Sequence, residues 1–100
     1  AQYKEGIYST YEFLPYCVQQ MKSQSLKAGA SYWDLYDAMG GKNSMFAWVN
    51  NGLAGKDYIH FSNKGASKAS QLFYDALIST YKLWEKKRIP EKKKIDGLKE

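Results

Sequence analysis

The chain has 100 residues, 44% of them hydrophobic and 16% aromatic, and a formal net charge of +5. This is enough apolar side chain for the core of one small domain, so the composition argues against a disordered chain. The single cysteine, Cys17, excludes an internal disulfide. No apolar run approaches the ~20 residues that a membrane-spanning helix needs, so no membrane span is expected.

The first half of the chain predicts a helix followed by a strand. Residues 1–13 are polar and rich in tyrosine without a sustained period, so we expect an irregular lead-in. Pro15 suits the first turn of a helix, where its missing N–H has no partner, and this predicts a helix over residues 14–28 that ends at Gly29. Residues 30–35, ASYWDL, are short, aromatic and preceded by a turn signal, as expected of a buried strand. A helix followed by a strand is the rhythm of an α/β fold.

The second half is predicted to be mainly helical. Residues 36–39 are expected to form one helical turn that ends at two glycines. Residues 43–55 carry apolar side chains between Asn and Gly, which predicts a packed loop with a short helix. The clearest helix is expected over residues 63–84, because apolar residues recur there every three or four positions. Ser62 precedes this helix and is expected to cap its first turn.

The C-terminal residues 85–100 hold much of the positive charge, with seven Lys or Arg against four Asp or Glu. Pro90 is expected to break any helix there. We therefore divide the chain into residues 1–84, a segment of one domain, and residues 85–100, a basic, flexible tail. Lysines and aromatics together could form a nucleic-acid surface, but the aromatics fall at core periods and no nucleic-acid motif is present. No nucleic-acid partner is expected.

The candidate catalytic residues are Asp57 and His60, the only histidine, which stand three positions apart just before the long predicted helix. A histidine that acts as general base must expose Nε2 while a carboxylate holds Nδ1–H. Two residues at this spacing on a loop can meet that requirement locally. On spacing alone, a helix cap or an ordinary surface histidine is the favoured interpretation, because Asp-x-x-His occurs by chance in many proteins.

The surrounding sequence changes that balance. The stretches WDLYDAMGG, NSMFAWVNNG and KDYIHFSNKGASKASQLFYDAL resemble, in order and separation, the C-terminal portion of SGNH (GDSL-type) hydrolases, especially bacterial acyl-esterases of carbohydrates. The resemblance covers roughly residues 30–77, and its most specific part is DYIHFSNKG followed by an amphipathic helix. It implies that His60 is the general base and Asp57 its orienting acid. It also implies an α/β fold, in which this chain is the C-terminal fragment of a three-layer α/β/α flavodoxin-like domain, mostly helical with one or few strands.

Other blocks of that family are missing from this sequence. It contains no Gly-Asp-Ser motif and no Gly-x-Ser-x-Gly elbow, and its serines are expected in helices, caps or polar turns, where none qualifies as an activated nucleophile. The resemblance therefore implies that an upstream N-terminal segment of a longer parent protein supplies the serine nucleophile and the oxyanion-hole residues. It also implies that this chain alone is inactive, because those groups provide much of the transition-state stabilisation.

The implied parent is a serine ester hydrolase that removes acetyl or other short acyl groups from a carbohydrate. Trp48 is a candidate to stack on a sugar ring, with core packing as the favoured alternative. No metal or organic cofactor is expected, because one His and one Cys do not make a transition-metal site. The compartment stays open, although the resemblance is compatible with the periplasm or cell surface. The competing hypothesis is a non-catalytic module that binds carbohydrate through the Trp48 loop or an anionic polymer through the basic tail.

Overall fold

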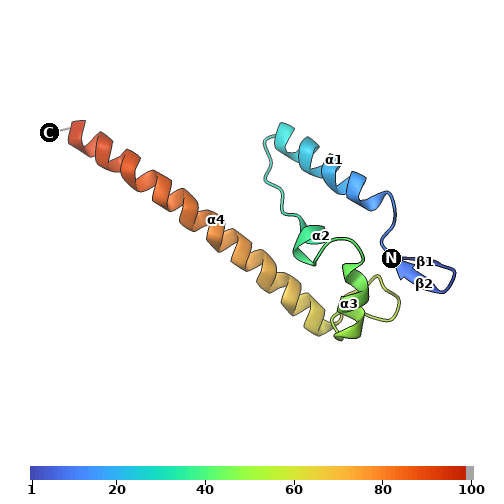
Figure 1. Cartoon of the computed structure of the whole chain (residues 1–100). Coiled ribbons are helices and arrows are strands. Elements are labelled where there is room, and N and C mark those ends of the chain that lie inside the picture. Colours follow the sequence, from blue (N-terminus) through green and yellow to red (C-terminus); the bar gives the residue numbers. More distant parts are fainter. Residues whose placement is uncertain (99–100) are drawn as a thin grey trace. The chain divides into compact units, whose positions relative to one another are not determined.

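The computed structural model describes residues 1–98, which are mostly helical and contain one small antiparallel sheet (Figure 1). Its elements in chain order are strands β1 (Gln2–Lys4) and β2 (Ile7–Ser9) and helices α1 (Leu14–Lys27), α2 (Leu35–Ala38), α3 (Ser44–Asn50) and α4 (Asn63–Leu98). The chain forms two compact units, Ala1–Ser70 and a second from Gln71 onward. The predicted combination of abundant helix with few strands is therefore present, while the strands lie where they were not expected.

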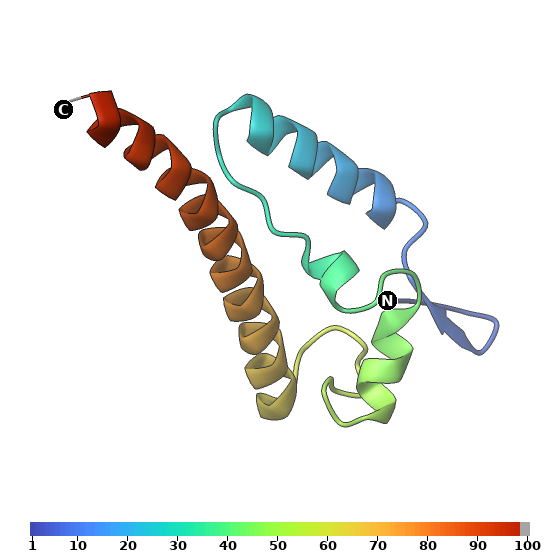
Figure 2. The same cartoon turned by 60° about the vertical axis from the view of Figure 1, so that its left-hand side comes forward.

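The N-terminal residues form a β-hairpin, so the prediction of an irregular lead-in was wrong. Tyr3 pairs with Tyr8 in the middle of the two strands, and the connection between them is shown in Figure 2. Glu5 and Gly6 occupy this connection with φ values of 51° and 80°. Positive φ at both central residues is what a two-residue type I′ turn requires. Glu-Gly is a weaker signal for this turn than Asn-Gly or Asp-Gly, which explains why the sequence did not predict it.

Helix α1 confirms the helix predicted over residues 14–28. Pro15 lies in its first turn, and Gly29 follows its C-terminal end with a φ of 81°. The N–H of Gly29 donates to the carbonyl of Leu26, and the N–H of Ala30 donates to the carbonyl of Ser25. This pair of bonds is the Schellman motif, which satisfies the last carbonyls of a helix and favours glycine at the left-handed position.

The strand predicted over residues 30–35 is wrong. Residues 30–34 have no regular structure, and helix α2 begins at Leu35, close to the helical turn predicted at residues 36–39. The reason is Asp34, whose carboxylate accepts a 2.8 Å hydrogen bond from the N–H of Asp37. An aspartate that accepts such a bond caps the start of a helix. The aromatic residues before Asp34 therefore lead into a helix and do not form a strand.

The core of the first unit forms around helix α3, which confirms the short helix predicted within residues 43–55. Trp48 is 4% exposed and Ala54 is 6% exposed, and among the hydrophobic residues whose burial is described these two are the buried ones. The indole N–H of Trp48 donates to the carbonyl of Met39 at 3.0 Å, and its ring lies 5.3 Å from that of Phe61. Trp48 therefore joins the segment before α3 to the segment before α4.

Helix α4 begins at Asn63 as predicted, and the N–H of Gly65 donates to the Ser62 hydroxyl at 3.1 Å, which confirms the predicted cap. The helix then continues past Pro90 to Leu98, so the predicted break was wrong. A proline inside a helix costs roughly 3 kcal/mol, but the Lys and Glu residues around it are good helix formers. The division into residues 1–84 and a flexible tail stays a prediction, and the last two residues of that tail lie outside the described part.

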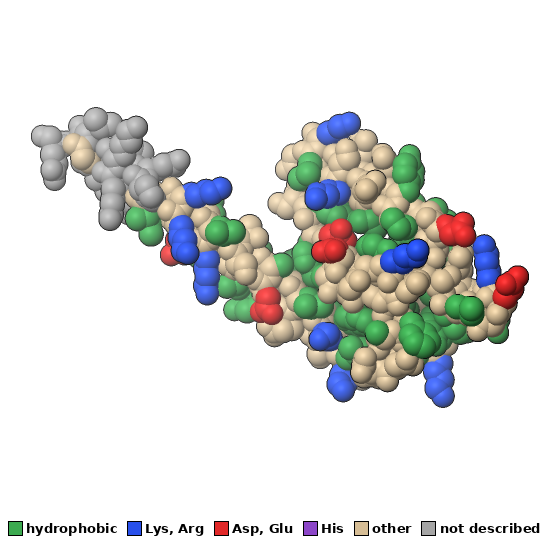
Figure 3. Space-filling model, in the orientation of Figure 1, with side chains coloured by type: hydrophobic (Ala, Val, Ile, Leu, Met, Phe, Trp, Pro, Cys, Tyr) green, Lys and Arg blue, Asp and Glu red, His purple; other side chains and the backbone are tan. Residues whose placement is uncertain are grey.

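Large apolar side chains remain exposed in both units, and Figure 3 shows hydrophobic side chains at the surface of each. In α1, Tyr16, Met21 and Leu26 are each more than half exposed, and α1 has no buried residue. In α4, Leu77 and Trp84 are more than half exposed. Within residues 1–98, no helix is both long enough and apolar enough to cross a membrane.

Candidate functional site

The segment between α3 and α4 is a short closed loop with Asp57 and His60 near its tip. Ala54 and Phe61 form an isolated antiparallel bridge, and the N–H of Gly55 donates to the carbonyl of His60 at 2.9 Å. The N–H of Tyr58 donates to the carbonyl of Gly55 at 3.0 Å, which closes the turn inside this bridge. The backbone thus fixes the two candidate residues from both sides.

The base of this loop is anchored on the first turn of α4. The N–H of Ser62 donates to the carbonyl of Leu53 at 3.0 Å, and its hydroxyl donates to the carbonyl of Gly52 at 2.6 Å. Gly65 is buried so closely against Leu53 that a Cβ on residue 65 would overlap the Leu53 carbonyl. The Ser-Asn-Lys-Gly run therefore both starts the helix and holds the loop against it.

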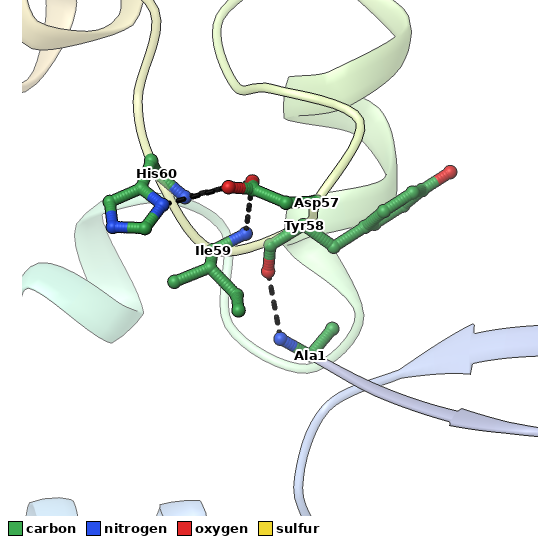
Figure 4. A network of polar contacts seen from close by, with 5 residues as sticks. All are labelled: Ala1, Asp57, Tyr58, Ile59 and His60. Atoms are coloured by element: carbon green, nitrogen blue, oxygen red, sulfur yellow. Dashed lines mark hydrogen bonds and ion pairs between the residues drawn. The ribbon is translucent and has the colours of Figure 1, made fainter.

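Asp57 and His60 meet, as the sequence predicted. The imidazole Nδ1 lies 2.7 Å from Oδ2 of Asp57, while Oδ1 of Asp57 accepts the N–H groups of Ile59 at 3.0 Å and His60 at 3.1 Å (Figure 4). The His60 side-chain bond, followed by these two backbone bonds, lowers the pKa of Asp57 from its ordinary 3.8 to about 2. The carboxylate is therefore ionised across the neutral range and holds the ring through a charge-assisted hydrogen bond.

The second ring nitrogen of His60, Nε2, points away from Asp57 in Figure 4. The side chain is 81% exposed, and Nε2 makes no hydrogen bond to any described residue. Because the Asp57 carboxylate can only accept, a neutral ring beside it carries its proton on Nδ1 and its lone pair on Nε2. This arrangement can take a proton from an alcohol or water that approaches from outside the loop.

Tyr58, one of the two residues between Asp57 and His60, has a backbone conformation that the sequence did not predict. Its φ is 58°, in the left-handed region that costs a non-glycine residue roughly 1–2 kcal/mol. Its ring stacks on Tyr8 of strand β2 with ring centres 3.7 Å apart and planes 8° apart. Its carbonyl accepts a 2.8 Å hydrogen bond from the nitrogen of Ala1. No local pattern could have indicated this, because the partners lie some fifty positions apart.

Trp48 does not join the pair. Its indole N–H donates to Met39, its ring packs against Phe61, and its side chain is buried. Stacking on a sugar needs an open ring face, so this burial favours the core-packing alternative for Trp48. The first unit also has an apolar cavity of about 220 Å³ that includes Leu14, Leu35 and Met45 in its wall, and neither Asp57 nor His60 lines it.

Among the side chains that the structure describes, no group of three or more His, Cys, Asp or Glu is placed to hold a metal ion. No family model matches this chain, and comparison with curated proteins and with solved structures finds no match either. The functional interpretation therefore depends on the geometry of Asp57 and His60 and on the sequence around them.

Proposed function

We propose that this chain is the C-terminal segment of a serine ester hydrolase of the SGNH type, to which it supplies Asp57 and His60. The observation that carries the proposal is the 2.7 Å contact from Asp57 Oδ2 to His60 Nδ1, with Nε2 left exposed. This is the arrangement that a histidine needs to act as a general base toward a serine. In this proposal the chain is part of a three-layer flavodoxin-like domain, completed by an upstream segment that carries the nucleophile and oxyanion-hole donors.

In the proposed reaction, Nε2 of His60 removes the proton from the serine hydroxyl as its oxygen attacks the ester carbonyl. The imidazolium then protonates the leaving alcohol, and an acyl-serine is formed. Water is next deprotonated by Nε2 and attacks the acyl group, which releases the carboxylic acid and returns the proton to serine. Asp57 stays ionised throughout and stabilises the imidazolium in each half-reaction.

The need for an upstream segment is supported by the exposed apolar surface. Tyr16, Met21, Leu77 and Trp84 are each more than half exposed. Fully burying one such side chain contributes roughly 1.5–3 kcal/mol, so an adjoining segment that covers them would stabilise this chain substantially. None of the serine hydroxyls in the described residues bonds to His60, which also agrees with a nucleophile supplied from elsewhere.

The proposed substrate is an acetylated or short-acylated carbohydrate, and the proposed compartment is the periplasm or cell surface. Both rest on the resemblance of the DYIHFSNKG region to carbohydrate acyl-esterases. The competing hypothesis of a carbohydrate-binding module is weakened, because it assigns sugar binding to the Trp48 loop and the Trp48 indole is buried.

The test is ester hydrolysis by the intact protein on a chromogenic acetyl ester. We expect His60→Ala to lower kcat/KM at least about a thousandfold and Asp57→Asn about a hundredfold or more, since each removes part of one proton-transfer unit. Lys56→Gln is the matched control, because Lys56 is an exposed neighbour in the same loop with no described polar contact. Rates like those of the wild type in both catalytic variants would exclude the proposed roles.

A further inference from the structure

We propose that Tyr8, on the N-terminal hairpin, is a positioning residue for the Asp57–His60 pair and acts by stacking on Tyr58. The effect of Tyr8 on catalysis rests on the proposed function, whereas the effect of Tyr8 on the geometry of Asp57 and His60 does not. Tyr8 belongs to a different element and makes no described contact with either Asp57 or His60. Any influence must therefore pass through Tyr58.

The first step is that the pair depends on the backbone of Tyr58. Residue 58 follows Asp57 directly and has a φ of 58°. With this reversal of the chain, the next two N–H groups, of Ile59 and His60, both reach Oδ1 of Asp57. The other carboxylate oxygen is then directed at His60 Nδ1. If residue 58 relaxed to a negative φ, the N–H groups would turn away and the carboxylate would lose the bonds that orient it.

The second step is that the hairpin holds Tyr58 at two points. The Tyr8 and Tyr58 rings are nearly parallel, with centres 3.7 Å apart. The carbonyl of Tyr58 accepts a hydrogen bond from Ala1, which precedes strand β1. Tyr3, the partner of Tyr8 across the hairpin, contacts the Tyr8 ring, and the two ring centres are 4.8 Å apart. One ring contact and one backbone bond thus oppose rotation of residue 58.

The third step is that the ring of Tyr58 does not act on the imidazole itself. In Figure 4 the Tyr58 ring and the His60 ring extend to opposite sides of the loop. Tyr8 therefore affects His60 through the conformation of the backbone between Asp57 and His60. This separates a positioning role from a catalytic one, and it predicts that aromatic stacking, rather than the Tyr8 hydroxyl, is the property required.

The experiment follows the pair by NMR in the intact protein with ¹⁵N-labelled histidine, the His60 signals being assigned with His60→Gln. In Tyr8→Leu we expect the share of ring protonated on Nδ1 to fall and the pKa of Asp57 to rise from about 2 toward 3.8. We also expect kcat to fall about tenfold to a hundredfold with little change in KM. Tyr8→Phe keeps the stack and should restore all three readouts. Phe13→Leu, which removes an exposed aromatic ring from a ring pair outside the loop, should alter none of them.

Two results would overturn the proposal. One is a folded Tyr8→Leu protein with unchanged ring nitrogen signals and Asp57 titration, and the other is a Tyr8→Phe protein as altered as Tyr8→Leu. If Tyr8→Leu does not fold, Tyr58→Gly and Tyr58→Leu decide instead. Glycine adopts a positive φ without bracing, so Tyr58→Gly should keep the Nδ1–H signal that Tyr58→Leu loses, and equal signals would overturn the proposal. Responsive NMR signals without ester hydrolysis in the wild type would contradict the proposed function and leave the positioning role standing.

Discussion

At the scale of single residues, the carboxylate of Asp57 has two separate tasks. One oxygen accepts two backbone N–H groups and so fixes the turn, while the other holds the imidazole. The first task makes Asp57 useful to the fold of the loop even in the absence of any chemistry. An Asp-x-x-His spacing is therefore informative about function only when, as here, the second oxygen is occupied by Nδ1 and Nε2 is left open.

The lowered pKa of Asp57 predicts an acid-dependent loss of stability. Because its folded-state pKa of about 2 lies below the ordinary 3.8, ionised Asp57 favours the folded state above about pH 4, and this contribution is lost as the pH falls toward 2. Asp57→Asn keeps an oxygen for the backbone bonds but cannot ionise. The difference in free energy of unfolding between the wild type and this variant should shrink as the pH falls from about 4 to 2. Denaturant titrations of both proteins at several pH values measure it, and a difference independent of pH would contradict the depressed pKa.

Gly65 shows how one residue connects the loop with helix α4. Alanine is a better helix former than glycine by roughly 1 kcal/mol, which alone would predict a stabilising effect for Gly65→Ala. A Cβ at this position overlaps the Leu53 carbonyl, however, and a backbone atom cannot move aside as a flexible side chain can. We expect the clash to win, with a loss of roughly 1–3 kcal/mol in the free energy of unfolding.

The same helix supplies the matched control for that prediction. A Cβ at Gly97 would meet nothing within 4 Å, so Gly97→Ala should leave stability unchanged or raise it slightly. Thermal or denaturant unfolding of both variants measures the contrast. Equal effects of the two substitutions would show that Gly65 is not in close contact with Leu53.

At the scale of elements, the sequence predicted those whose signals are local. Helix α1 with its first-turn proline and Gly29 terminator, helix α3, and the start of α4 with its Ser62 cap all have their causes within a few residues. The prediction of a strand at residues 30–35 was wrong because the aromatic run favours a strand, whereas Asp34 caps the start of helix α2. Here two local signals compete, and the hydrogen bond from the N–H of Asp37 to Asp34 outweighs the strand propensity of the aromatic residues.

In the candidate site, too, the local contact could be predicted from the sequence and the long-range contact could not. The meeting of Asp57 and His60 could be predicted, because three positions of separation within a turn allow the contact without help from the rest of the chain. The stack of Tyr8 on Tyr58 could not, because it depends on how a hairpin packs against a distant loop. The hairpin was not predicted because Glu-Gly is a weak turn signal. Without the hairpin, neither the sheet nor the contact of Tyr8 with the loop could be predicted.

Gly29 tests the element-level account of α1. Nothing lies within 4 Å of a Cβ built there, so its φ of 81° is the only obstacle to a side chain. Gly29→Ala should therefore lower the free energy of unfolding by roughly 1 kcal/mol through backbone strain alone. Gly29→Asn should cost less, because asparagine tolerates the left-handed region. Chemical denaturation of the two variants measures the order, and an equal cost for both would point to a cause other than backbone conformation.

At the scale of the whole molecule, each unit exposes apolar side chains along its helices. On α4, Leu77, Tyr81 and Trp84 recur at helical spacing, and each is more than half exposed. A helix of this kind is stabilised mainly by packing of its apolar face and only weakly by intrinsic propensity. An adjoining segment that packs on this face is therefore part of the proposed function.

This surface predicts different behaviour for the chain alone and joined to the proposed upstream segment. Residues 1–100 by themselves should bind a hydrophobic dye and associate as concentration rises, because uncovered apolar faces find one another. Joined to the upstream segment, the same residues should bind little dye, and the protection of α4 amides from hydrogen exchange should rise. Leu77→Lys is the variant that separates the effects, since it should reduce association of the lone chain yet destabilise the joined protein. Lys82→Glu is its control, because it replaces one exposed charged side chain of the same helix with another. A lone chain that stays monomeric, binds no dye and unfolds cooperatively would show that α4 needs no cover, because an apolar face of this size is otherwise costly in water.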